Sequence, residues 1–211
     1  MHNFSRRKFI AISTIGSFFG LSSTDSLANT ITPSETEGPF YPITPQKDLD
    51  FDLTSIDGKD GIAKGQVVFI HGQVIDQDSK PVESATVDIW QANAAGRYRH
   101  PHDPNPAPLD PGFQGWAIVQ SGKKGMFQFK TIVPGSYPVN KEWVRPPHIH
   151  FKVSKRGYSE LITQMYFPEN ELNNSDRLLQ GKSKSEQVLM IAKRVSDKPY
   201  TLEYKITLGR V

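Results

Sequence analysis

The chain has 211 residues, no cysteine and a formal net charge of +3. This length suits one domain with a sizeable core, and the missing cysteines exclude disulfides, thiolate metal sites and iron–sulfur clusters. Residues 1–28 hold Arg6, Arg7 and Lys8 against Asp25, a net +2, which leaves about +1 of the whole-chain +3 for the remainder. With so little charge and no basic patch interleaved with aromatics, we expect no nucleic-acid partner.

The N-terminus has the layout of a secretory signal. Arg6-Arg7-Lys8 precedes an uncharged run from Phe9 to Leu21, and the small-residue sequence Ser26-Leu27-Ala28 follows. The paired arginines indicate the twin-arginine export machinery as a partner, and the run is shorter than the roughly 20 residues of a membrane span. We therefore expect residues 1–28 to be a twin-arginine signal peptide and residues 29–211 to be the mature domain. The protein is expected to be periplasmic or otherwise exported, with no stable membrane anchor.

After a proline-rich, loop-like stretch over residues 29–65, the chain consists of short runs rich in Val, Ile, Phe and Thr, several of them alternating. Helical periodicity is weak, and only Glu169–Leu179 suits a short helix. This pattern predicts an all-β fold, an antiparallel β-sandwich with long loops that carry the functional site. The expected strands are Val67–Val74, Thr86–Trp90, Trp116–Val119, Phe127–Val133, His148–Val153, Leu161–Phe167, Val188–Ala192 and Leu202–Leu208.

One long connection, residues 93–115, contains five prolines and three glycines and no strand signal. Long loops of this kind in compact domains are usually functional or disordered. Tyr98 lies in this loop, and Tyr137 lies in a second turn, Pro134-Gly-Ser-Tyr-Pro138. A tyrosine in a turn is usually a packed aromatic with its hydroxyl at the surface, so neither residue indicates a site when taken alone.

The stretch Trp143-Val-Arg-Pro-Pro-His-Ile-His-Phe151 carries two histidines one residue apart. In an extended strand His148 and His150 share one face, while Ile149 and Phe151 share the other, which we expect to face the core. Two imidazoles at this spacing can reach one ion, although two surface histidines on a half-buried strand are an equally good interpretation. Combined with two tyrosines, the set favours a hard trivalent cation, because phenolate is an anionic oxygen donor.

Several motifs, in order, resemble the intradiol ring-cleavage dioxygenases, most closely the iron-binding β chain of protocatechuate 3,4-dioxygenase. The resemblance covers residues 33 to 170 approximately. The matching stretches are Thr36-Glu-Gly-Pro-Phe-Tyr-Pro42, Trp90-Gln-Ala-Asn-Ala-Ala-Gly-Arg-Tyr-Arg-His100, Ala107-Pro-Leu-Asp-Pro-Gly-Phe113, Lys130-Thr-Ile-Val-Pro-Gly-Ser-Tyr-Pro138, Arg145-Pro-Pro-His-Ile-His-Phe151 and Leu161-Ile-Thr-Gln-Met-Tyr-Phe167.

The resemblance implies a non-haem Fe(III) enzyme that cleaves a catechol ring with O2 between its two hydroxyl-bearing carbons. Matched by position, the metal ligands are Tyr98, Tyr137, His148 and His150. Tyr137 would also act in catalysis by leaving the metal and taking a substrate proton. The resemblance further implies that Arg145 and Gln164 act at the substrate. His71, His100 and His102 are expected to be structural or surface histidines, with His100 and His102 as weaker candidates near Tyr98.

Two departures from the protocatechuate pattern concern the substrate. Val139 stands where those β chains carry a bulky aromatic, and Val144 is an extra residue between Trp143 and Arg145. Both are expected to reshape the wall that faces the ring substituent. We expect this chain to lack the helical N-terminal dimerisation region of catechol 1,2-dioxygenases, which favours the protocatechuate-like branch. The choice among protocatechuate, catechol and larger diphenols stays open, as does the need for a homo-oligomer or a homologous second chain.

Two other functions are weighed against this one. A secreted, non-catalytic β-sandwich binding module that retains the metal site would keep the fold without turnover. A zinc enzyme would use His148 and His150 with water, but two tyrosines at matching positions argue against it. The colour of the purified protein separates iron from zinc, because iron–tyrosinate is red-brown and zinc is colourless.

We predict that the double substitution Arg6→Lys with Arg7→Lys leaves the protein in the cytoplasm, because the twin-arginine route requires the arginine pair. Cell fractionation of the wild type and the double variant measures this. Unchanged export of the twin-lysine protein would contradict the assignment.

Overall fold

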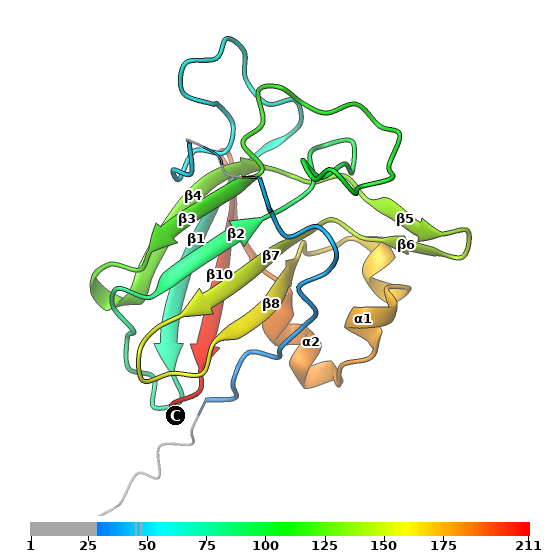
Figure 1. Cartoon of the computed structure of the whole chain (residues 1–211). Coiled ribbons are helices and arrows are strands. Elements are labelled where there is room, and N and C mark those ends of the chain that lie inside the picture. The colour runs from blue at the N-terminus through cyan, green and yellow to red at the C-terminus, as the bar shows by residue number, and fades with distance from the viewer. Residues whose placement is uncertain (1–28, 45, 47) are drawn as a thin grey trace, which may run out of the picture.

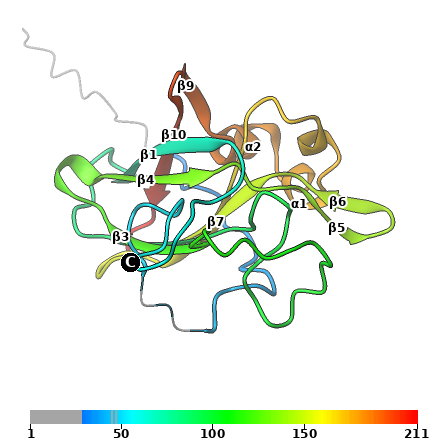
Figure 2. The same ribbon diagram turned by 90° about the horizontal axis from the view of Figure 1, so that it is seen from above.

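The computed structural model describes residues 29–211 except 45 and 47, so the expected signal peptide lies outside the described residues. Two four-stranded sheets pack face to face, and a two-stranded hairpin projects from one end (Figure 1, Figure 2). The expected β-sandwich is confirmed. In the part of the chain that is described, no helix is long and apolar enough to cross a membrane.

The first sheet has the strand order β4-β1-β10-β9 and the second has the order β3-β2-β7-β8, while β5 and β6 form the hairpin. The strands are β1 Val67–Asp76, β2 Thr86–Trp90, β3 Trp116–Gln120, β4 Met126–Ile132, β5 Tyr137–Asn140, β6 Trp143–Arg145, β7 His148–Ser154, β8 Leu161–Tyr166, β9 Lys193–Asp197 and β10 Tyr200–Leu208. The helical segments are η1 Lys123–Gly125, η2 Glu171–Asn174, α1 Arg177–Gln180 and α2 Lys184–Met190.

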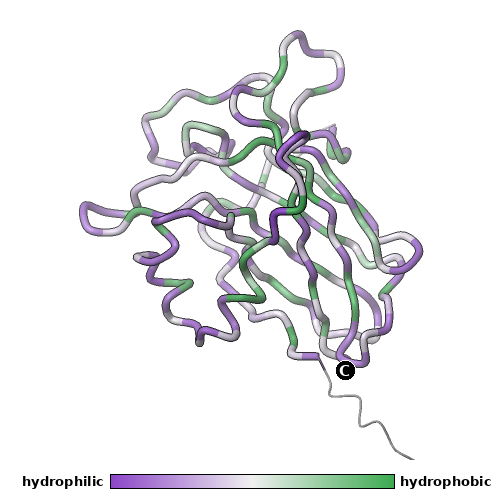
Figure 3. Tube along the Cα trace, turned by 180° about the vertical axis from the view of Figure 1, so that it is seen from behind, coloured by the Kyte–Doolittle hydropathy of each residue, from purple (hydrophilic) through white to green (hydrophobic). Residues whose placement is uncertain are grey.

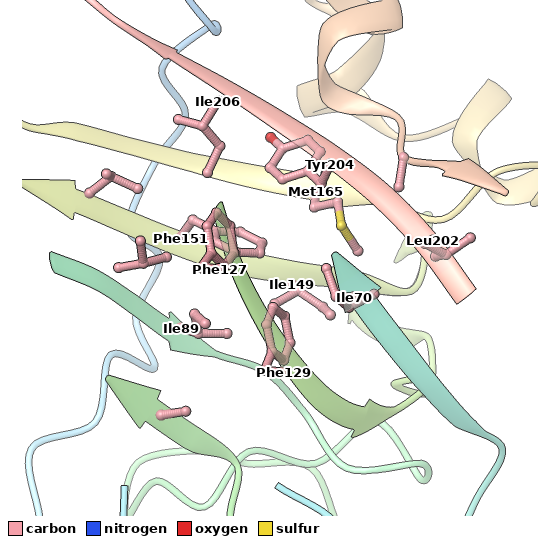
Figure 4. Packing of buried hydrophobic residues seen from close by; sticks show 14 of the residues in the cluster. Ile70, Ile89, Phe127, Phe129, Ile149, Phe151, Met165, Leu202, Tyr204 and Ile206 are labelled. Atoms are coloured by element: carbon pink, nitrogen blue, oxygen red, sulfur yellow. The ribbon is translucent and has the colours of Figure 1, made fainter. Parts of the chain in front are cut away.

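The core lies between the two sheets. Phe151 of β7 packs against Phe129 of β4 and Tyr204 of β10, with ring centroids 6.0 and 5.3 Å apart, so the central strands of both layers meet at this side chain (Figure 4). Ile149 and Phe151 are fully buried, which confirms the expected core face of this strand. Apolar residues recur along the strands, whereas the tips of the loops and of the β5–β6 hairpin are mostly hydrophilic (Figure 3).

The sheets are not strictly antiparallel. Strands β1 and β10 pair in parallel, from Phe69 opposite Thr201 to Asp76 opposite Leu208, and the other strand pairs of the two sheets are antiparallel. The long loop over residues 93–115 and the segment before β1 gather at the same end of the sandwich as the hairpin (Figure 1). This end carries the candidate site.

Two expectations for the helical segments were wrong, and three strands were missed. The run 188–192, expected as a strand, belongs mainly to α2, because Ser183 and Glu186 form a reciprocal capping box that begins a helix there. The single helix expected over 169–179 is two short segments, η2 and α1, separated at Asp176. Strands β5, β6 and β9 were not expected, since short strands that face solvent lack a clear apolar alternation.

Candidate metal centre and active site

Strand β7 carries both histidines on the outer face of the second sheet, beneath the loops, and β8 pairs alongside it. His148 is paired with Tyr166 and His150 with Gln164 across the strands. The imidazoles are only 2% and 3% exposed, so they are not surface histidines. The indole of Trp90 stacks on the His150 ring, with centroids 4.8 Å apart and an interplanar angle of 11°. His150 is therefore fixed in orientation by a neighbouring strand.

Tyr98 comes from the loop over residues 93–115 and Tyr137 is the first residue of β5, and the backbones just before the two tyrosines touch. Gly96 has φ +77°, and a Cβ on it would lie 2.4 Å from the carbonyl oxygen of Ser136. Gly135 donates its N–H to the carbonyl of Asn93 at 2.9 Å, and a Cβ there would lie 2.5 Å from the Ala94 carbonyl oxygen. Only glycine allows this approach. The two glycines thus hold the loop that carries Tyr98 against the turn that precedes Tyr137.

The four aromatic side chains form one cluster. The Tyr98 hydroxyl oxygen lies 3.3 Å from Nε2 of His148 and 3.0 Å from Nε2 of His150. The Tyr137 ring lies edge-on to the Tyr98 ring at 5.6 Å between centroids, and 5.7 Å from the ring of His148. The structure therefore brings together the four residues expected as metal ligands.

The donor atoms of this cluster fit a metal ion. Nδ1 of His148 lies 2.7 Å from the carbonyl of Pro146, which places its proton there and leaves a lone pair on Nε2. Ligand atoms that share an ion at about 2.0–2.2 Å lie roughly 3 Å apart, close to the separations around Tyr98. No group of three or more His, Cys, Asp or Glu side chains suited to a metal occurs among the described residues. A metal here would depend on the tyrosines.

The electrostatics of the protein alone disfavour charge on these groups. Burial raises the pKa of Tyr98 well above its usual value, and the nearby Tyr137 raises it further. Burial likewise raises the pKa of Tyr137, although Arg145 opposes this. Burial and the Arg145 charge lower the pKa of His148 strongly and that of His150 to about 3. Neutral imidazoles are the form that binds metals, and a cation would favour phenolates that burial disfavours.

Arg145 stands beside the cluster in a buried network. Its Nε donates to Oδ2 of Asp176 at 2.7 Å, and its Nη2 donates to Oε1 of Gln164 at 2.6 Å and to the Tyr166 hydroxyl at 3.1 Å. Among the described residues, Nη1 has no hydrogen-bond partner. Gln164 also donates from Nε2 to the carbonyl of Thr36 at 3.0 Å, which joins β8 to the N-terminal segment.

The ion-pair partner of Arg145 is thus Asp176, while Glu142 faces Arg177 at the surface. Asp176 and Tyr166 were both missed in the sequence. Asp176 begins a four-residue helix, and its only local signal is a helix-capping residue, because the contact with Arg145 spans 31 positions. Tyr166 lies two residues beyond Gln164 on β8, so strand alternation could have identified it.

A cavity of about 400 Å³ opens beside the cluster. Tyr137, His150 and Arg145 line it, together with Val139 and Trp143 of the β5–β6 hairpin. Both valines were expected to shape the wall of the site. Val139 does line this cavity, whereas Val144 is absent from the lining. On β6, Trp143 and Arg145 point to the cavity, so the alternating Val144 points away.

A larger cavity of about 820 Å³ lies on the other side of the Tyr98 loop, lined in part by Arg97, Arg99 and His100. It contains none of the four clustered rings. His100 packs beside His102 and against Phe40, with centroids 5.5 and 5.7 Å away. Neither histidine belongs to the cluster, and His71 lies on β1 in the other sheet.

Comparison with known proteins assigns this sandwich to a class of oxygenase. The family model described as Dioxygenase matches residues 36–209. Over 159 residues the chain is 40% identical to the protocatechuate 3,4-dioxygenase beta chain of Burkholderia cepacia, covering 74% of this chain and 67% of that one. The chain belongs to the intradiol ring-cleavage dioxygenase family.

Other relatives differ in what they act on. The catechol 1,2-dioxygenase of Candida albicans is 29% identical over 84% of this chain and 62% of its own length. The hydroxyquinol 1,2-dioxygenase of Rhizobium sp. (strain MTP-10005) is 29% identical, and the chain spans about half of it, 48%. The solved 3-chlorocatechol 1,2-dioxygenase of Rhodococcus opacus 1CP superposes with a TM-score of 0.66 at 25% identity, covering 88% of this chain and 76% of that one.

We predict that Asp176→Asn lowers the free energy of unfolding by about 3–5 kcal/mol, because it leaves the buried Arg145 charge without its partner. The Arg145 and Asp176 side chains are 5% and 0% exposed. The matched control is Glu142→Gln, which removes a carboxylate from the exposed pair with Arg177 at 3.7 Å and should change little. Urea unfolding midpoints measure both variants, and equal midpoints would contradict a structural role for Asp176.

Proposed function

We propose that this protein is a non-haem Fe(III)-dependent intradiol dioxygenase. It would break the bond between the two hydroxyl-bearing carbons of a catechol and give a cis,cis-muconate-type product. Both atoms of O2 enter the product, one on each separated carbon, so no external reductant is required. The observation that carries this proposal is the convergence of Tyr98, His148 and His150 at about hydrogen-bond distance, with Tyr137 and Arg145 at the wall of the adjoining cavity.

The family is generally dependent on non-haem iron, and the donor set of this chain suits it. Tyr98, Tyr137, His148 and His150 would hold the ion, since two phenolates balance the charge of a hard trivalent cation better than that of zinc. When bound, ferric iron supplies Lewis acidity that favours the doubly deprotonated catechol and draws electron density from its ring.

Tyr137 is the tyrosine that reaches the substrate. Of the two phenols, only Tyr137 lines the 400 Å³ cavity, whereas Tyr98 is 3% exposed behind it. A phenolate whose pKa is raised by burial is a strong base once formed. Tyr137 would therefore accept a proton from a catechol hydroxyl at its phenolic oxygen.

Arg145 would stabilise the negative charge that develops as the ring is attacked. Its guanidinium lines the cavity, its Nε and Nη2 are held by neighbours, and its Nη1 donors are left for the substrate. A donor that is fixed before the reaction needs no reorganisation during it. Gln164 is a positioning residue in this scheme, because its Oε1 accepts from Arg145 and its Nε2 holds the N-terminal segment at Thr36.

Within the family we infer that the chain belongs to the protocatechuate-like branch. The 40% identity to a protocatechuate 3,4-dioxygenase beta chain supports this, against 29% for the hydroxyquinol enzyme from Rhizobium sp.. Membership of this branch is inferred from sequence similarity and does not by itself name the ring substituent. The ring substituent that the site accepts depends on the wall of the cavity.

We predict that His148→Ala loses bound iron and the red-brown colour together, because one of four protein ligands is removed. The control is His71→Ala, on the other sheet, which should keep both. Elemental analysis and visible absorbance of the purified proteins measure this. Zinc in the wild type, or a full complement of iron in His148→Ala, would overturn the ligand assignment.

We predict that Arg145→Gln combined with Asp176→Asn keeps iron and catechol binding while the oxygen-dependent step slows by roughly 10²–10³. The second substitution is included because Arg145→Gln alone would leave Asp176 buried without a counter-charge. Asp176→Asn alone is the control for loss of the ion pair. Arg145→Lys should rescue the rate only in part, because an ammonium lacks the planar fork of donors.

Single-turnover kinetics with bound catechol and a pulse of O2 measure this step. An unchanged rate in the iron-loaded double variant would rule out the catalytic role of Arg145. Iron-loaded wild-type protein that binds catechols without consuming O2 would favour the non-catalytic binding module instead.

A further inference from the structure

Much of the lining of the 400 Å³ cavity beside the tyrosine–histidine cluster is apolar. Four prolines, Pro39, Pro104, Pro106 and Pro138, line it together with Phe40, Val139, Trp143 and Leu178. These residues come from the N-terminal segment, the loop over residues 93–115, the β5–β6 hairpin and α1. Four separate parts of the chain therefore contribute apolar surface to one wall.

Three polar side chains of the lining are already engaged with the protein, those of Asp103, Asn105 and Trp143. Asp103 accepts the Tyr98 N–H at 2.6 Å through Oδ2 and the Asn105 N–H at 2.9 Å through Oδ1. Asn105 donates from Nδ2 to the Gly96 carbonyl at 2.9 Å and accepts the Ala107 N–H at 3.0 Å. The Trp143 indole N–H points to Asp176 at 3.3 Å. These groups secure the loops and have little left for a ligand.

The charges of the lining amount to one carboxylate and one guanidinium. Asp103 is 8% exposed, and Arg145 is matched by Asp176 behind it. A further cation close by, Arg177, stacks on the ring of Trp143 and faces Glu142 at 3.7 Å, but it is not part of the lining. Within the described chain, an anionic substituent in this cavity would meet Asp103 and no cation free of a partner.

The cavity has room for more than one ring. An apolar cavity of about 150 Å³ holds a benzene molecule, and a volume of about 400 Å³ leaves space for a substituent of several atoms. Besides Tyr137, His150 and Arg145, which the proposed function uses, the lining includes Val139, Phe40 and Leu178, so a ring substituent in this cavity would contact apolar side chains. Burying an unpaired carboxylate against such surfaces is costly, while burying an apolar group is favourable.

We propose that the preferred substrates are catechols with an uncharged, apolar ring substituent, and not catechols that bear a carboxylate. This inference rests on the proposed function and names the substrate class of the same site. Val139 is then a specificity-determining residue, because its side chain lines the cavity. It lies at the bulge of the hairpin, where it has no partner between the pairs Pro138–Val144 and Asn140–Trp143.

The test compares 3,4-dihydroxybenzoate with its methyl ester, in which a methyl group replaces the negative charge of the carboxylate. With the iron-loaded full chain in its own oligomeric state, kcat/KM should be at least about tenfold higher for the ester. 4-Ethylcatechol should match or exceed unsubstituted catechol. A kcat/KM for the acid equal to or above that of the ester would overturn the proposal.

A pair of variants locates the effect. Val139→Lys places an ammonium on the wall and should raise the ratio of acid to ester by about tenfold. Val144→Lys is the matched control, because this neighbouring exposed valine points away from the cavity, and it should leave the ratio unchanged. No shift in Val139→Lys, or an equal shift in both variants, would contradict the assignment of the substituent to this wall.

Cleavage of unsubstituted catechol distinguishes a wrong substrate class from a wrong proposed function. If catechol is cleaved and the acid is preferred, only the substrate class is wrong. If the iron-loaded protein cleaves neither catechol nor any substituted catechol, the proposed function fails and the substrate class fails with it.

Discussion

The pleat of strand β7 is the constraint on which both the core and the site depend. Phe151 and Ile149 point between the sheets, and His148 and His150 point to the opposite face. Because side chains alternate, a slip of one residue would send the histidines into the core and the phenylalanine into the site. The packing of Phe151 against the first sheet therefore also fixes which face the imidazoles occupy.

A second constraint holds the loops to this sheet. Asp176 is fully buried and accepts from Arg145, Trp143 and Tyr166, and it also caps α1 through the Leu179 N–H at 2.9 Å. One carboxylate thus joins the hairpin, the second sheet and the helical segment. This explains how a residue on the three-residue strand β6 can hold a defined position, although an isolated hairpin of that length would be unstable.

The electrostatics of the site depend on these contacts. Burial disfavours both the phenolate form of the tyrosines and the protonated form of the histidines. A bound cation would favour the phenolates and leave the imidazoles neutral. In the lining of the adjoining cavity, Asp103 and Asn105 form hydrogen bonds with the backbone of the loop over residues 93–115. The guanidinium of Arg145, paired with Asp176, lines this mostly apolar cavity, and a fixed cation there suits a reaction in which negative charge develops on the substrate.

The sequence by itself determined the sandwich class, most of the strands and the four clustered aromatic residues. Strand alternation identifies the faces of β7 from local residue order, and the motifs around Tyr98, Tyr137 and Arg145 lie within short windows. The helix at α2 was missed because its apolar run resembles a strand unless the Ser183–Glu186 capping box is given more weight. Only the tertiary structure decided that Asp176 pairs with Arg145, that Val139 lines the cavity while Val144 does not, and that Gly96 and Gly135 press the tyrosine loops together. These contacts join positions far apart in the chain or depend on a bulge in the hairpin, and no local pattern of residues encodes them.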